Sequence, residues 1–293
     1  MPTESKKRIH FVINPAAGHD EPVLNTINDV AHQYGVEWSS SVTHKFGDAT
    51  EFARRAAEEG YEIVAGYGGD GTQHEIANGV LGTKAVMGVL PGGTGNNFSK
   101  ELDTPQTLRP AVELLCGDHK VRDIDVVQMG DVCFILRLYV GIETEQQTSR
   151  EDKDKYGKLA YVIDAYRKAR DSKEVDYRIT LDGEVFEVPG MVLYVVNAAK
   201  NGAGISVAGD LSSVDDGLLD VFILNMNDLN TIAGATDRML KLDTKNAGEY
   251  MRQGKEMTID TDPDQPVWTD GEYTGRTPIS LKVLPGALSV IVP

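Results

Sequence analysis

The chain has 293 residues, is 41% hydrophobic and carries a formal net charge of −16 at pH 7. This length is typical of about two domains. The charge excludes nucleic acid as a partner, because binding of its phosphates requires clustered Lys and Arg. Repulsion from anionic lipids, the lack of an apolar run of about 18 residues and a polar N-terminus together predict a cytoplasmic protein with peripheral, transient membrane contact.

In the first part of the chain, apolar runs alternate with helical patterns, as in βα units on a parallel sheet. Strands are predicted at residues 9–13, at a run ending near residue 43, and at residues 62–65 and 85–90, with helices from about residues 23, 48 and 73. Two of the strand ends, residues 66–72 and 91–98, are rich in glycine, which lets a backbone approach a ligand closely. Because open α/β sheets bind ligands at the carboxyl ends of their strands, both turns are candidates for a binding site.

From about residue 123, strand-like runs follow one another closely. They cover residues 124–129, 133–140, 177–181, 185–188, 192–196 and 218–224, with one predicted helix near residues 159–168. Short turns such as Asp182-Gly183 are typical of hairpins, so this part is predicted to be a mainly antiparallel β domain. The pattern of residues 279–292 is strand-like but does not assign this segment to either domain.

The turn at residues 66–71 matches the GxGxxG pattern of dinucleotide sites. Such a site also needs an acidic residue about 20 positions later, and the next strand end, Val89-Leu90-Pro91, has none. No GxxxxGK[ST] motif is present either. What remains is a turn whose backbone N–H groups can hold phosphates, in which Asp70 would be useful as a ligand of Mg²⁺. Alternatively, Asp70 only caps the following helix.

Five motifs stand in register along the chain. They are NPAAG (residues 14–18), GGDGT (68–72), PGGTGN (91–96), DGLLD (216–220) and DGE (270–272), with Glu75 and Asn78-Gly79 downstream of the second. Their order and spacing resemble the catalytic domain of the diacylglycerol kinase family, which includes sphingosine and ceramide kinases and soluble bacterial lipid kinases. The resemblance covers nearly the whole chain.

The resemblance implies an α/β fold with two domains and an active site in the cleft between them. The first is a Rossmann-like nucleotide domain with a parallel sheet, residues 1–123, completed by the C-terminal strand 279–293. The second is a mainly antiparallel β-sandwich domain for the lipid substrate, residues 124–278.

The resemblance also implies functional residues. Those expected around ATP are Asn14, Thr43, Gly69, Asp70, Gly71, Thr72, Glu75 and Thr94, although Thr43 is equally explained as an ordinary strand-end residue. A second, structural Mg²⁺ position is implied at Ser213, Asp216 and Leu218. A tight Asp-Gly turn explains the same residues without a metal.

Two positions depart from the family pattern. Many members have asparagine where this chain has His74, and many have aspartate where it has Asn97. The change at position 97 removes one negative charge from the expected Mg²⁺ site and puts the rate and the substrate branch in doubt.

The predicted function is transfer of the γ-phosphate of ATP, with Mg²⁺, to the hydroxyl of a lipid such as diacylglycerol. One alternative is a kinase of a soluble acceptor, similar to the NAD kinases. Another is a regulatory module that binds nucleotide without turnover, which Asn97 favours. The sequence leaves a homodimer open.

Two identical triplets compete for the role of general base. Asp182-Gly183-Glu184 lies between two strand-like runs, so a hairpin turn explains it fully and Glu184 is predicted to be inert. Asp270-Gly271-Glu272 is also compatible with a turn, but the resemblance favours it. It implies that Glu272 accepts the proton of the lipid hydroxyl, while Asp270 positions the turn.

Overall fold

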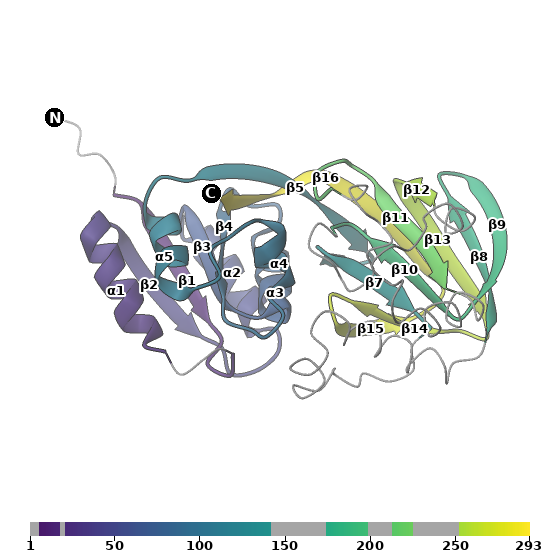
Figure 1. Cartoon of the computed structure of the whole chain (residues 1–293), viewed down its shortest axis with the longest axis horizontal. Helices are drawn as coiled ribbons and strands as arrows, with labels where there is room; N and C mark the ends of the chain where they lie inside the picture. Colours follow the sequence, from purple (N-terminus) through teal and green to yellow (C-terminus); the bar gives the residue numbers. More distant parts are fainter. Residues whose placement is uncertain (1–5, 18–20, 142–173, 199–212, 225–251) are drawn as a thin grey trace, which may run out of the picture. The chain divides into compact units, whose positions relative to one another are not determined.

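The computed structural model describes residues 6–17, 21–141, 174–198, 213–224 and 252–293 (Figure 1). The chain divides into two compact units. The first unit comprises Met1–Val126 and Pro285–Pro293, and the second comprises Val127–Leu284. Two strands contribute residues to both units, β5 (Lys120–Met129) and β16 (Ile279–Val292).

The first unit contains a parallel sheet with helices on both faces. Its strands, in the spatial order β2-β1-β3-β4, are β2 (Glu37–Val42), β1 (Arg8–Ile13), β3 (Ile63–Gly68) and β4 (Val86–Pro91). The end of β16 lies parallel to β4, with Val290 opposite Met87. The helices are α1 (Val23–Tyr34), α2 (Asp48–Glu58), α3 (Asp70–Val80), α4 (Asn97–Glu101) and α5 (Leu108–Cys116).

Burial on both faces explains why β1, β3 and β4 have nearly continuous apolar sequences, whereas the edge strand β2 is mostly polar and partly exposed. Every residue of β3 is buried. On one face, α1 and α5 pack together over a core that includes Ile9, Phe11 and Leu115. On the other face, α2 and α3 pack together over β1 and β3, and they cross closely at Gly79, where a side chain would clash with Ala53.

The turn after the third strand is shorter than the sequence pattern indicated. β3 continues through Gly68, and α3 begins at Asp70, so the predicted helix is present but starts three residues earlier than expected. The reason is close packing of the helix on the strand: a side chain at Gly66 would clash with Ile76, and the Gln73 side chain donates to the Gly66 carbonyl at 2.9 Å. Gly66 therefore serves packing rather than a ligand.

The second unit is a sandwich of two antiparallel sheets. One contains the first part of β16 with β13 (Glu256–Asp262), β8 (Val175–Leu181) and β9 (Glu184–Gly190), and β5 pairs there with β6 (Val132–Phe134). The other has the order β12 (Arg252–Gly254), β11 (Leu219–Leu224), β10 (Val192–Val196), β7 (Arg137–Val140), β14 (Pro266–Thr269) and β15 (Glu272–Arg276).

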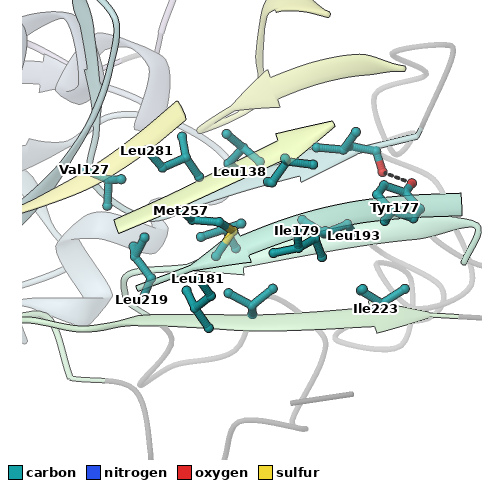
Figure 2. Close-up of a cluster of buried hydrophobic side chains, with 14 of the residues drawn as sticks. Val127, Leu138, Tyr177, Ile179, Leu181, Leu193, Leu219, Ile223, Met257 and Leu281 are labelled. Carbon is teal, nitrogen blue, oxygen red and sulfur yellow. Dashed lines mark hydrogen bonds between the residues drawn. The ribbon is translucent and has the colours of Figure 1, made fainter. Parts of the chain in front are cut away.

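Alternating apolar side chains from both sheets form the core of the second unit (Figure 2). Leu138, Leu193 and Ile223 come from one sheet, and Ile179 and Met257 from the other. Figure 2 also shows the buried Tyr177 hydroxyl, which donates to the Val140 carbonyl at 3.3 Å. The polar end of this ring is thus satisfied inside an apolar core.

The predicted fold class, a parallel α/β sheet plus a mainly antiparallel β-sandwich, is confirmed. The predicted strand at residues 133–140 is divided into β6 and β7, because the intervening backbone N–H groups are bound by a carboxylate described below. The strands β12, β13, β14 and β15 were not predicted. The predicted helix near residues 159–168 lies outside the described residues.

Candidate active site

The carboxyl ends of the four parallel strands meet at one edge of the sheet in the first unit, here called the ligand edge. Asn14 follows β1, Thr43 follows β2, Gly69 follows β3 and Thr94 lies in the turn after β4. Asp70, Gly71 and Thr72 form the first turn of α3, and Glu75 comes next along the same helix. All eight residues predicted to surround ATP therefore belong to the ligand edge or to the helix that starts there.

Asn14 joins β1 to α3 at this edge. Its side-chain amide donates to the Thr72 hydroxyl at 3.0 Å, and its side-chain oxygen accepts the backbone N–H of Ala16 at 3.0 Å. Its own backbone N–H donates to the Tyr67 carbonyl at 3.0 Å. The buried Thr72 hydroxyl is therefore held in a fixed position beside the turn after β3.

The two glycine turns touch each other. The N–H of Gly92 donates to the Gly68 carbonyl at 2.9 Å, and a side chain at Gly93 would clash with the Gly69 Cα. Asn96 closes the second turn, because its side chain accepts the N–H of Gly93 and donates to the Gly93 carbonyl, both at 2.8 Å. Gly93 must be glycine because its backbone touches that of Gly69. Without side chains at these positions, a ligand can contact the backbone groups directly.

Asp70 connects the same two turns through its side chain. One carboxylate oxygen accepts the backbone N–H of Phe98 at 2.9 Å, and the other accepts the side-chain amide of Asn97 at 3.0 Å. Asp70 is itself the first residue of α3, whereas its carboxylate binds the first turn of α4. The alternative prediction was that Asp70 caps α3, the helix that follows it. This was wrong, because the Asp70 side chain caps α4 instead.

Asp70 retains the capacity to bind Mg²⁺ in this arrangement. An ionised carboxylate offers about four lone-pair sites, and two are used by Asn97 and Phe98. The half-buried carboxylate and the nearby Thr72 hydroxyl are hard oxygen ligands of the kind that Mg²⁺ prefers, together with water and phosphate oxygens. Among the residues that the structure describes, no three His, Cys, Asp or Glu side chains cluster as a metal site, so one carboxylate would be the main protein ligand.

Glu75 shapes the segment that enters α2. Its carboxylate accepts the backbone N–H groups of Gly47 at 2.7 Å and Ala49 at 3.2 Å, and its carbonyl accepts the hydroxyl of Thr50 at 2.9 Å. In this structure Glu75 thus acts as the cap of α2. Its predicted place around ATP stays a prediction.

In the second unit, Asp270 and Glu272 form the hairpin between β14 and β15. Asp270 accepts three backbone N–H groups, from Ile135 at 2.8 Å and from Leu136 and Arg137 at 2.9 Å. These bonds attach the hairpin to the segment that links β6 to β7. They take up the N–H groups of Ile135 and Leu136, so the strand is interrupted between β6 and β7. The half-buried Glu272 is the first residue of β15 and lies opposite Thr269.

The turn before β11 places Asp216 at its centre. The Asp216 carboxylate accepts the backbone N–H groups of Leu218 at 2.9 Å and Ser213 at 3.3 Å, while the Ser213 hydroxyl donates to Asp215 at 2.6 Å. These contacts describe a closed turn that is complete without a metal. The predicted Mg²⁺ position at Ser213, Asp216 and Leu218 stays a prediction.

Sequence reasoning gave no structural role to two residues of the ligand edge. Asn97 was noted only as a departure from the family pattern, yet its amide holds Asp70. Asp48 was noted only as a helix start, yet its buried carboxylate accepts the N–H groups of His44 and Lys45. The bond from the His44 N–H lowers the pKa of Asp48 most strongly. These N–H groups precede Asp48 by four and three residues, whereas the aspartate of an ordinary Asx-turn bonds a residue that follows it, so the known local pattern did not reveal this contact.

Comparison with known proteins gives matches over almost the whole chain. Residues 8–129 match the diacylglycerol kinase catalytic domain, and residues 137–292 match the YegS C-terminal domain, described as similar to the β-sandwich of NAD kinase. Among the described residues, no helix is long and apolar enough to cross a membrane.

Individual relatives agree with these matches. A diacylglycerol kinase of Staphylococcus saprophyticus is 29% identical over 98% of this chain and 96% of its own length, and one of Staphylococcus carnosus gives the same values. A crystal structure of a diacylglycerol kinase from Bacillus anthracis superposes with a TM-score of 0.80, at 26% identity over 99% of each chain. The chain therefore belongs to the diacylglycerol kinase family and is a lipid kinase.

Proposed function

We propose that this lipid kinase transfers the γ-phosphate of ATP, in the presence of Mg²⁺, to the hydroxyl of diacylglycerol to give phosphatidic acid. The observation that carries the proposal is the contact of two glycine turns at the ligand edge, with the Asp70 carboxylate held between them. Backbone N–H groups at a helix start bind phosphates, and a neighbouring carboxylate is useful there when a cation neutralises it.

The first unit is assigned to the nucleotide and the second to the lipid. Residues 69–72 would bind the phosphates. The bonded pair Asn14 and Thr72 would border the site, and Thr94 would contribute from the turn after β4. Asp70 would hold Mg²⁺, which neutralises charge on the phosphates when it is bound. Diacylglycerol is chosen as acceptor because the relatives with matches over the full chain are diacylglycerol kinases.

Glu272 is assigned as the general base. As the lipid hydroxyl oxygen attacks the γ-phosphorus, its proton moves to the Glu272 carboxylate and the bond to ADP breaks. Asp270 positions the turn through its three backbone bonds rather than touching the substrate. Membrane contact is proposed to be transient, because the net charge of −16 is repelled by anionic lipid.

The test is a transfer assay with radiolabelled ATP and a panel of lipids in detergent, with products separated by thin-layer chromatography. Labelled phosphatidic acid should form only with a divalent cation. Asp70→Ala should abolish transfer, whereas Asp118→Ala, at an exposed carboxylate beyond α5, should remain near wild type. A folded Asp70→Ala protein with substantial activity would refute the assignment. ATP binding without transfer to any lipid would support the regulatory alternative.

A further inference from the structure

The loop between β2 and α2 presents an aromatic ring to solvent at the ligand edge. Phe46 is 71% exposed, more than any other large hydrophobic side chain in the described part of the chain. The neighbouring His44 and Lys45 are exposed as well. A ring with this exposure contributes little to the core, and its face remains available to contact a ligand.

Two carboxylates fix the conformation of this loop. Asp48 accepts the N–H groups of His44 at 2.8 Å and Lys45 at 3.1 Å. From the other side, Glu75 accepts the N–H of Gly47 at 2.7 Å. Gly47 has a φ of +89°, a conformation that side chains rarely tolerate. Because the backbone on both sides of Phe46 is hydrogen-bonded, the segment that carries the ring is ordered before a ligand binds, which lowers the entropy cost of binding.

The same bonds place the loop relative to the phosphate-binding turn. Glu75 lies five residues beyond Asp70 on α3, which corresponds to about 7.5 Å along the helix axis. The loop also starts at Thr43, whose N–H donates to the Ile13 carbonyl at 2.9 Å, beside Asn14. A nucleotide whose phosphates lie at the start of α3 can therefore extend its ribose and base along the edge toward Phe46.

We propose that the Phe46 ring is the stacking platform for the purine base of the donor nucleotide. This inference rests on the proposed function and adds a subsite for the base. An aromatic ring binds any base through its π-face, so this subsite supports binding of ATP with little selection against GTP. The exposed Lys45 precedes Phe46 directly in the chain and adds one positive charge to this loop. An exposed aromatic ring can also insert into membranes, but the acidic charge of the chain and the carboxylates of Asp48 and Glu75 bonded to this loop disfavour that partner.

The test compares a ligand that carries a purine base with one that consists of phosphates alone. Binding of Mg²⁺-ADP and Mg²⁺-tripolyphosphate is measured by calorimetry for the full chain and for Phe46→Ala. Loss of stacking should weaken ADP binding by about tenfold and leave tripolyphosphate binding unchanged. Phe46→Trp should restore ADP affinity, and its fluorescence should change when ADP is added. Tyr34→Ala is the matched control, because Tyr34 is an exposed ring at the last residue of α1, at the opposite edge of the sheet.

Three outcomes would overturn the inference. Unchanged ADP affinity in Phe46→Ala would show that the ring does not touch the base. Equal loss for both ligands would show a general effect on the loop. Binding to vesicles of anionic lipid is measured for the same two proteins. If Phe46→Ala loses vesicle binding but keeps its affinity for ADP, the ring belongs to a membrane contact. If the wild-type chain binds neither ADP nor tripolyphosphate, the proposed function fails together with this subsite.

Discussion

Two turns in the second unit share the sequence Asp-Gly-Glu and the same backbone. In each, the aspartate and glycine form the two-residue loop of a hairpin, with φ of 49° and 90° at Asp182 and Gly183 and of 50° and 96° at Asp270 and Gly271. Positive φ at both positions is the requirement of a type I′ turn, which Asp-Gly satisfies. The local sequence therefore determines the local structure in both places.

The surroundings of the two turns differ. Asp182 is exposed and accepts two backbone N–H groups, from Lys255 and Glu256 at 2.9 Å. Asp270 is half-buried and accepts three, as described above. Likewise Glu184 is exposed, whereas Glu272 is half-buried. The two turns have the same sequence and backbone but differ in burial and in the strands that they contact. Four pairs of variants at matching positions can test this comparison.

The largest expected effect is on catalysis. Glu272→Gln should lower turnover by at least about 100-fold, because a positioned base typically contributes that much, while ATP affinity changes little. Glu184→Gln should remain near wild type. Turnover and ATP binding are measured for both variants, and equal small effects or a larger loss at Glu184 would reject Glu272 as the base.

The next effect is on stability. Asp270→Ala removes the acceptor of three N–H groups, two of them on the buried residues Ile135 and Leu136, so we expect a loss of about 3 kcal/mol in the free energy of unfolding of the second unit. Asp182→Ala should cost less than half as much, because water can replace its acceptor. Denaturant unfolding can be followed with Trp268, which stacks on Tyr139 in the second unit. Similar losses of unfolding free energy in Asp270→Ala and Asp182→Ala would show that the two aspartates contribute equally to stability, against this prediction.

These contacts also show which parts of the molecule could be predicted from the sequence. The βα units and the Asp-Gly turns follow from local patterns, and they were predicted. The bond from Asn97 to Asp70 joins residues 27 apart, and that from Ile135 to Asp270 joins residues 135 apart. Such partners depend on how distant elements pack, which periodicity does not encode. The strand β13 is different, because its exposed polar residues alternate with the buried Met257 and Ile259; this local period of two was available in the sequence and was missed.

A smaller effect should be equal at the two turns. Gly183→Ala and Gly271→Ala both place a side chain at positive φ, with open space around the new atom, so each should cost about 1 kcal/mol in the free energy of unfolding. Gly183→Asn and Gly271→Asn should cost less, since asparagine tolerates this conformation. Unfolding of all four variants is measured under one condition. A much larger loss at one glycine would mean that the turns do not share their backbone geometry.

The smallest effect concerns pH. The backbone N–H of Glu256, and then that of Lys255, lowers the pKa of Asp182 below its ordinary value of 3.8. A carboxyl whose pKa is lower in the folded state stabilises the fold above its unfolded pKa, and this contribution disappears as the pH falls through the folded pKa. The melting temperature of wild type should therefore exceed that of Asp182→Asn at neutral pH, and the gap should close below pH 3.8. All other titrating groups are common to the two proteins and cancel in the difference. A difference in melting temperature that stays constant down to the lowest pH would show that the negative charge of Asp182 does not contribute to stability through these two hydrogen bonds.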